Sequence, residues 1–113
     1  MESLKEKVFA ISKDIRYVAI YTNDQLISSV RPDIQNTSSS ESDKYEELIV
    51  NPTLLKLVTQ RGNIDCGGAK YVIIKYGYFY ELVITIKGGH LSVGIELNTD
   101  LMNIVEGIEK LIN

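Results

Sequence analysis

Three short runs rich in β-branched and aromatic residues follow one another closely in the second half of the chain. They cover residues 69–76, 78–87 and 90–97, and glycines separate them at Gly77 and at Gly88-Gly89. Glycine favours tight turns because it adopts backbone conformations that other residues avoid. Strands joined by such short turns are antiparallel. The last run alternates apolar and polar residues, which predicts a sheet with one face turned to a core.

A second pair of short runs lies nearer the N-terminus, at residues 17–22 and 25–30. Asn23-Asp24 lies between them and is a turn signal, so the pair predicts a β-hairpin. The sequence therefore predicts five strands in all. The polar stretch 31–42, which contains Pro32 and three consecutive serines, is expected to be a loop.

Three helices are predicted from apolar residues at helical spacing, over residues 2–13, 43–61 and 100–112. Gly62 is expected to end the second helix. Pro52 lies inside this helix, and Asn51-Pro52 also fits an N-cap followed by proline at the first helical position. The segment is therefore either one kinked helix or two short helices end to end.

The element order α-β-β-α-β-β-β-α predicts one α/β domain of the α+β type over residues 1–113. Its sheet is antiparallel, and the helices can cover the two sheet faces. A chain of this length can bury one modest core but not two.

The second helix has apolar residues on two opposite sides when it is plotted at about 100° per residue. One side holds Tyr45, Leu48, Ile49, Pro52 and Leu55, and the other holds Val50, Leu54, Leu57 and Val58. A helix that is apolar on two sides must be buried on both, and a sheet covers only one. We therefore predict a homodimer. The predicted interface comprises Val50, Leu54, Leu57, Val58 and Tyr71. The alternative is that a kink at Pro52 turns both apolar sides onto the same sheet.

Composition excludes several classes of function. The chain has 15 acidic and 12 basic residues and a net charge of −3, which argues against a nucleic-acid partner. One cysteine and one histidine allow neither an intrachain disulfide nor the usual Cys/His zinc site, so no metal or cofactor is expected. No apolar run is long enough to span a bilayer, and the N-terminus does not resemble a signal peptide, so we expect a cytoplasmic protein.

Candidate catalytic residues are few. The glycine-rich segment 62–70 lacks the lysine and hydroxyl residue of a phosphate-binding loop. His90 is the only histidine and is expected at the edge of a turn rather than as a catalytic base. Glu81 and Glu96 fall on neighbouring predicted strands and are expected on a solvated face. Cys66 is expected to be a small turn residue. We therefore predict no catalytic site and no enzyme.

The chain resembles the roadblock/dynein light chain family, and looks most like its archaeal members. The resemblance is carried by residues 15–21 before a polar turn, residues 26–29, the helix over residues 45–58, and the run 93–98 that leads into the last helix. It implies a roadblock-like or profilin-like domain, in which one long helix and the two terminal helices sandwich a five-stranded antiparallel sheet. Pro52 in the long helix and the length of the polar loop depart from the family pattern.

The resemblance also implies a function. Members of this family form homodimers or heterodimers through the long helix and the adjacent sheet edge, and several bind or regulate small Ras-like GTPases. We therefore predict a non-enzymatic dimeric scaffold or adaptor that regulates a small GTPase. The alternative is a small-molecule sensor domain of PAS-like or profilin-like shape, which needs an internal apolar pocket with a few polar groups.

Overall fold

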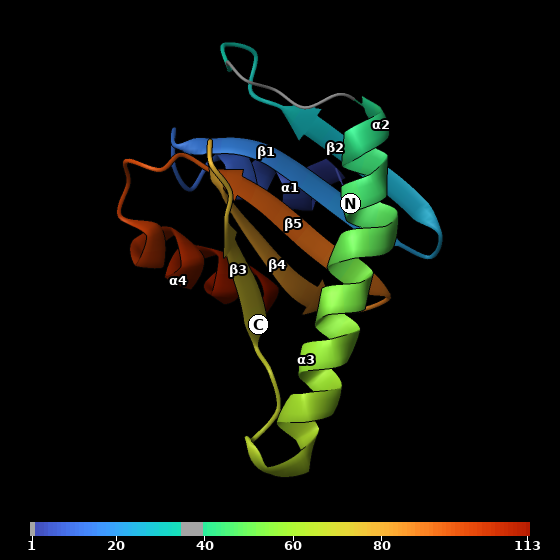
Figure 1. Ribbon diagram of the computed structural model, residues 1–113. Coiled ribbons are helices and arrows are strands. Elements are labelled where there is room, and N and C mark those ends of the chain that lie inside the picture. The colour runs from blue at the N-terminus through green and yellow to red at the C-terminus, as the bar shows by residue number, and fades with distance from the viewer. Residues whose placement is uncertain (1, 35–39) are drawn as a thin grey trace.

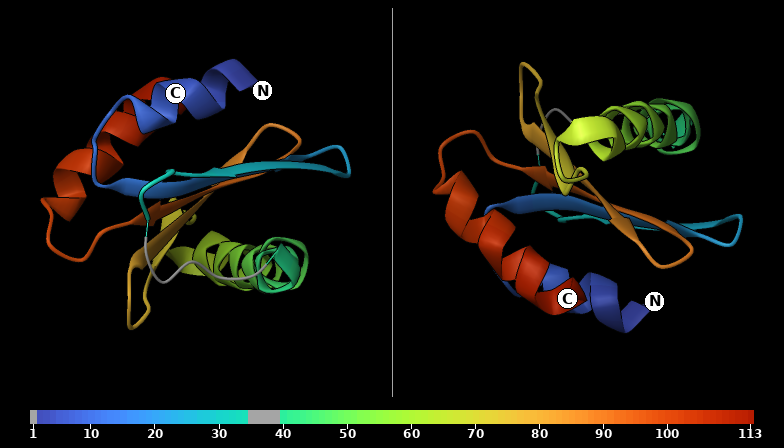
Figure 2. Two further views of the ribbon diagram at one scale, coloured as in Figure 1. Left: turned by 90° about the horizontal axis from the view of Figure 1, so that it is seen from above. Right: turned by 90° about the horizontal axis from the view of Figure 1, so that it is seen from below.

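The computed structural model describes residues 2–34 and 40–113, which fold into three layers. A five-stranded antiparallel sheet of order β2-β1-β5-β4-β3 forms the middle layer (Figure 1). Helices α1 and α4 lie side by side on one face, and one long helix crosses the other face (Figure 2). The predicted α+β fold class and sandwich arrangement are confirmed.

The five strands agree with the predicted runs but are shorter in the second half of the chain. They are β1 (Ile15–Thr22), β2 (Gln25–Val30), β3 (Tyr71–Lys75), β4 (Tyr80–Ile86) and β5 (Gly89–Ile95). Asn23 and Asp24 both adopt positive φ angles, 52° and 66°, which suits the tight hairpin turn between β1 and β2. Strand β5 pairs with both β1 and β4, which joins the N-terminal hairpin to the C-terminal strands.

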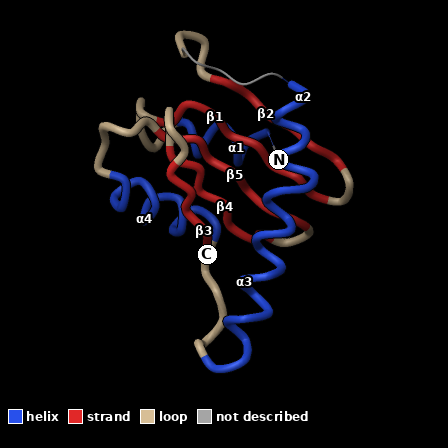
Figure 3. The backbone as a smooth tube through the Cα atoms, viewed as in Figure 1, coloured by secondary structure: helices blue, strands red, loops and turns tan. Residues whose placement is uncertain are grey.

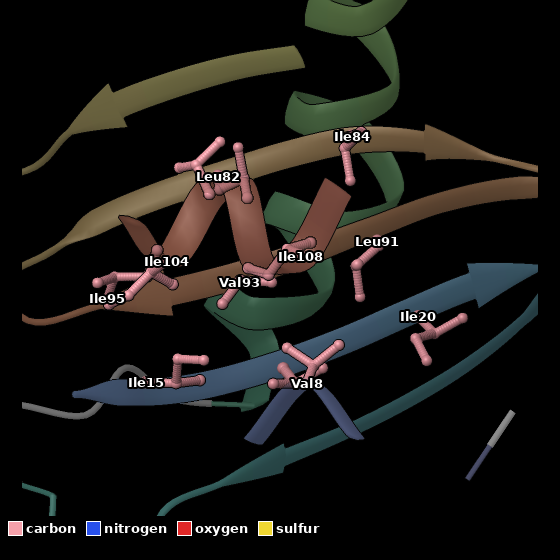
Figure 4. Close-up of a cluster of buried hydrophobic side chains, with 12 residues drawn as sticks. Val8, Ile15, Ile20, Leu82, Ile84, Leu91, Val93, Ile95, Ile104 and Ile108 are labelled. Carbon is pink, nitrogen blue, oxygen red and sulfur yellow. The ribbon is translucent and has the colours of Figure 1, made fainter. Parts of the chain in front are cut away.

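The aliphatic core lies between the sheet and the terminal helices α1 (Glu2–Phe9) and α4 (Leu101–Ile112). Asp100 caps α4, since its side chain accepts a hydrogen bond from the backbone N–H of Asn103 at 3.3 Å. Side chains from both helices meet those of the three central strands (Figure 4). The buried cluster consists of Val8, Ile15, Val18, Ile20, Leu82, Ile84, Leu91, Val93, Ile95, Ile104, Val105 and Ile108.

The first helix ends earlier than predicted. The apolar spacing favoured a helix to residue 13, but α1 ends at Phe9. Ile15 instead begins β1, opposite Ile95 of β5. Strand pairing therefore overrides the helical spacing at this point.

The long helix is continuous from Ser40 to Asp65 (Figure 3). It consists of α2 (Ser40–Tyr45), a π-helical turn η1 (Glu46–Val50) and α3 (Asn51–Asp65). Asn51 is fully helical, with φ −66° and ψ −45°, and its N–H bonds to the carbonyl of Glu46 five residues back. The segment is therefore not two separate helices: the wider turn accommodates Pro52, which has no N–H to donate, without a break in the helix.

The end of the long helix also differs from the prediction. Gly62 does not terminate it, because α3 continues to Asp65. The carbonyl of Gly62 accepts hydrogen bonds from the N–H groups of Cys66 and Gly68, both at 3.0 Å, so the chain folds back against it. Gly67 and Gly68 then turn the chain with positive φ angles of 76° and 89°.

The start of the long helix shortens the predicted loop over residues 31–42. Helix α2 begins at Ser40, and residues 35–39 of this loop lie outside the described residues. Within residues 2–34 and 40–113, no helix is long and apolar enough to cross a membrane.

Candidate functional site

The two faces of the sheet differ in chemistry. The face toward α1 and α4 is aliphatic, whereas the face under the long helix carries the polar side chains of Tyr17 on β1, Glu81 on β4, and His90 and Ser92 on β5, beside the buried Ala19 and Val83. The strand registers place Tyr17 and Glu81 on either side of Gly94 in one row across the sheet. A polar sheet face under a helix is unusual, because buried polar groups need hydrogen-bond partners.

Glu47, on the π-helical turn, supplies those partners from above. Its side chain is fully buried. Its Oε1 atom accepts hydrogen bonds from Ser92 Oγ at 2.5 Å and from Asn51 Nδ2 at 3.1 Å, and lies 2.8 Å from His90 Nε2. Its Oε2 atom accepts a hydrogen bond from Tyr17 Oη at 3.1 Å. One carboxylate therefore links the helix to β1 and β5.

Asn51 extends this arrangement toward β4. Its Nδ2 atom lies 3.0 Å from Ser92 Oγ and 3.3 Å from Glu81 Oε2, as well as contacting Glu47. Glu47 and Asn51 are four residues apart, so the helical turn that contains them points both toward the sheet. We call Glu47, Asn51, Glu81, His90 and Ser92 the buried polar cluster; each is at most 3% exposed.

Two members of this cluster are incompletely bonded. The Oδ1 atom of Asn51 and the Oε1 atom of Glu81 are both buried and accept no hydrogen bond from any described residue. Burial, and then the negative charge of Glu47, raise the pKa of Glu81 well above its usual value. Burial and the same charge also raise the pKa of the Tyr17 hydroxyl, which stays protonated as a donor.

A cavity of about 320 Å³ opens beside the cluster, at the end of the sheet where β1 begins and β3 turns into β4. Its lining residues are Arg16, Tyr17, Val30, Ile34, Ser42, Asp43, Glu46, Glu47, Tyr76, Gly77, Tyr78, Phe79 and Glu81. Within it, Tyr76 Oη donates to Glu46 Oε1 at 2.8 Å, while Glu46 Oε2 is buried without a partner among the described residues. Burial raises the pKa of Glu46. The cavity thus combines aromatic walls with buried carboxyl groups.

A group of ion pairs lies next to the cavity. Glu96 contacts Arg16 at 3.1 Å and Arg31 at 2.8 Å, and Arg31 also contacts Asp33 at 2.8 Å. The guanidinium of Arg16 lies 5.2 Å from the ring centre of Phe79, in a cation–π contact. These contacts tie the segment after β2 to the ends of β1 and β5.

The structure corrects two expectations about polar residues. His90 is 3% exposed and contacts Glu47 under the helix, so it is not a solvated turn-edge residue. Glu81 is buried rather than solvated, and Glu96 lies beyond the end of β5, paired with arginines and not with Glu81. Cys66 is exposed at the C-terminal end of α3, as a turn residue would be. Within the described chain, no group of three or more His, Cys, Asp or Glu side chains is placed to hold a metal ion.

Sequence reasoning missed the buried polar cluster because Asn51 was considered only as a possible N-cap and no contact with the sheet was assigned to Glu47. A signal was present. Glu81 and Ser92 occupy the second face of strands whose first face is aliphatic, and one Glu-x-x-x-Asn spacing, Glu47 to Asn51, lies on the helix above them. Polar residues on a sheet face that a helix covers favour a buried network.

The predicted interface residues do not all share one surface. Leu57 is 58% exposed, while Val50, Leu54 and Val58 are half-buried on the long helix. Tyr71 is also half-buried, but it packs against the aliphatic core on the opposite face of the sheet.

Four of the five exposed large apolar side chains in the described long helix instead follow one stripe, and the fifth, Leu48, is 43% exposed. Tyr45, Ile49, Leu57 and Ile64 are 63%, 53%, 58% and 75% exposed, with Thr53 between Ile49 and Leu57. Residues at spacings of four, seven and eight share a helix face. The side toward the sheet carries Glu47 and Asn51 at its N-terminal half, so the division of the helix into two apolar sides was wrong.

The structure is a three-layer α+β domain with a roadblock-like fold. No protein-family model matches the chain, and no curated protein matches its sequence. Among solved structures, the chain is similar to the crystal structure of MglC from Myxococcus xanthus, with a TM-score of 0.56. The similarity covers 96% of this chain and 92% of MglC, at 5% sequence identity. At that identity the likeness supports the fold alone.

Proposed function

We propose that the protein is a non-enzymatic adaptor that forms a homodimer through the outer stripe of its long helix and regulates a small Ras-like GTPase. The observation that carries the dimer is the row of exposed side chains at Tyr45, Ile49, Leu57 and Ile64. Leu54 and Val58 lie at its margin as half-buried residues. The proposal assigns no catalytic step to the chain and includes a cytoplasmic location.

Burial of this stripe provides the driving force for dimerisation. A large aliphatic or aromatic side chain gains about 1.5–3 kcal/mol when it is fully removed from water. A two-fold symmetric contact uses the same stripe on both copies, so every apolar residue contributes twice. A single charged residue at the centre of the stripe is therefore also introduced twice, and weakens the dimer from both sides.

The dimer is tested by measuring mass in solution over a range of concentrations. Sedimentation of the full chain should give a dimer at micromolar concentration, and Leu57→Glu should give a monomer. Met102→Glu is the matched control, since Met102 is 48% exposed on α4, on the far side of the sheet, and it should leave the dimer intact. A wild-type monomer at all concentrations would remove the basis of the proposal.

The GTPase partner follows only from the family resemblance. The full chain, immobilised and exposed to lysate of its native organism, should retain a protein of the Ras-like class, identified by mass spectrometry and then shown to bind in purified form. If no purified small GTPase from the lysate binds, this part of the proposal fails while the dimer stands.

The cavity beside Glu81 favours a second candidate function, a small-molecule sensor of PAS-like or profilin-like shape. Such a site needs a concave, largely apolar pocket with a few polar groups. The volume of about 320 Å³ lies within the range of ligand pockets, and its wall combines aromatic rings with carboxyl groups. Titration of the full chain with small ligands, followed by nuclear magnetic resonance (NMR), tests this candidate separately from dimerisation.

A further inference from the structure

Two buried acceptors in the cavity have no donor from the described residues. They are Oε1 of Glu81 and Oε2 of Glu46, and both side chains line the cavity. Glu81 is 2% exposed, and its other oxygen already accepts from Asn51. An unsatisfied buried acceptor is costly, so a ligand that donates a hydrogen bond to it gains more than the same ligand would gain in water.

The charge around these acceptors specifies the donor. Glu46, Glu47, Asp43 and Glu81 all line the cavity, and the cationic side chain among its described lining residues, Arg16, donates to Glu96 at 3.1 Å. A donor that also carries positive charge is therefore favoured over a neutral one. Rings of Tyr76, Tyr78 and Phe79 supply faces for an apolar body and for a cation.

We propose that this cavity binds a small organic cation with a primary ammonium group, which donates an N–H hydrogen bond to Glu81 Oε1 while its apolar body packs against the aromatic wall. The inference rests on the second candidate function, that the cavity binds a ligand, and not on the dimer. The cavity volume accommodates about ten non-hydrogen atoms, at about 30 Å³ each as in liquid water. A phenyl ring joined to an aminoethyl group has this size.

Three matched probes separate the parts of this inference. They are 2-phenylethylamine, 2-phenylethanol and N,N,N-trimethyl-2-phenylethylammonium, each titrated into the full chain at neutral pH by NMR or calorimetry. The alcohol offers a hydrogen bond without charge, and the trimethylammonium offers charge without an N–H. The amine should bind at least tenfold more tightly than either. Its binding should change the NMR chemical shifts of Tyr76, Tyr78 and Phe79.

Variants test whether Glu81 is the acceptor. The raised pKa of Glu81 keeps a proton on it in the empty cavity, so the ammonium binds the carboxylate that forms when this proton is released to water. Glu81→Gln keeps the shape of the side chain but cannot become an anion, so it should abolish the preference for the amine over the alcohol. Glu106→Gln on the exposed face of α4 should leave that preference unchanged. Glu46→Gln, which should weaken amine binding severalfold, keeps the test decisive if Glu81→Gln does not fold. Unchanged amine binding in both cavity variants would overturn the inference.

Each negative result in the probe titrations rejects a different part of the proposal. If the alcohol binds as tightly as the amine, the cavity binds ligands but the assignment of a cation is wrong. If none of the three probes binds, both the assignment and the sensor function fall.

Discussion

Glu47 holds the long helix onto the sheet through a single buried carboxylate. It accepts hydrogen bonds from Tyr17 of β1 and Ser92 of β5, as well as from Asn51 of its own helix. A buried charge is tolerated only when such bonds replace the lost water. The stability of the helix–sheet contact should therefore depend on this residue more than on any single apolar contact under the helix.

Replacement of Glu47 by leucine tests that dependence. Leucine fills a similar volume but leaves the donors of Tyr17, Ser92 and Asn51 without their acceptor, so the free energy of unfolding should fall by about 3 kcal/mol or more. Ser92→Ala removes one donor and should cost about 1 kcal/mol. Urea unfolding of both variants gives the comparison, and a Glu47→Leu protein as stable as wild type would show that the cluster contributes little.

Glu81 predicts a pH dependence with a definite sign. Burial and the charge of Glu47 raise its pKa well above 4.5, so the folded protein keeps a proton that the unfolded chain releases. As pH rises between 4.5 and the raised pKa, the unfolded state binds fewer protons than the folded state. The free energy of unfolding therefore falls, by up to about 1.4 kcal/mol per pH unit.

Glu81→Gln isolates this contribution, because glutamine resembles the protonated acid and does not titrate. The variant and wild type should have similar stability near pH 4.5, and the variant should become progressively more stable than wild type as pH rises. Thermal or urea unfolding at several pH values, with Glu106→Gln as reference, measures the difference. A difference that stays constant with pH would contradict the raised pKa.

At this scale the sequence predicted the apolar residues well and the buried polar residues poorly. Leu91, Val93 and Ile95 alternate along β5 and are all buried, as expected. His90 was predicted to lie at the edge of a turn, but it is buried against Glu47, which is 43 residues away in the sequence. Local sequence does not show which helix covers a strand end, so such burial is invisible until the tertiary arrangement is known.

At the scale of elements, Gly62 shows how closely the long helix approaches the chain that follows it. A Cβ atom at Gly62 would lie 2.6 Å from the carbonyl oxygen of Gly68, a contact that real structures essentially never show. The Cβ atom would be fixed to the backbone of α3, and the oxygen belongs to the backbone of Gly68. Neither atom could move away unless α3 or the turn after it also moved. The return of the chain toward β3 therefore requires glycine here.

Gly62→Ala gives a prediction opposite to helix propensity. Alanine normally stabilises a helix interior by about 1 kcal/mol over glycine, but the clash with Gly68 should produce a net loss of about 1–3 kcal/mol. Gly77→Ala is the matched control, because a Cβ there meets nothing within 4 Å and should change stability by less than about 0.5 kcal/mol. If Gly62→Ala is as stable as wild type or more so, the close approach is wrong.

The elements themselves were largely predictable, and their boundaries were not. Asn23-Asp24 and Gly88 form the expected turns because turn chemistry is local. The first helix stops early because Ile15 pairs with a strand 80 residues later in the chain, and the long helix passes Pro52 through a π-helical turn. Both outcomes depend on contacts that no short window of sequence contains.

At the scale of the whole molecule, the two sheet faces have separate roles. The terminal helices close the aliphatic core on one face, and the long helix covers the other face (Figure 2). The outer side of the long helix carries the apolar stripe. We expect a second copy of the chain to bind along this outward stripe. The sequence predicted that the helix carries surplus apolar surface, but the residues it named were only partly those that are exposed.

Two copies of the chain are expected to meet along this stripe, and the distance between spin labels on the two copies shows whether they do. Thr53 is exposed midway along the stripe, and Cys66 is the only cysteine, so Thr53→Cys in a Cys66→Ser background carries one label on each copy. Pulsed electron paramagnetic resonance should then show an intermolecular distance within about 25 Å, roughly two helix diameters. A label on Met102→Cys of α4, in the same Cys66→Ser background, should give a much longer distance. The absence of any coupling at position 53, or a short distance at position 102 instead, would contradict the claim.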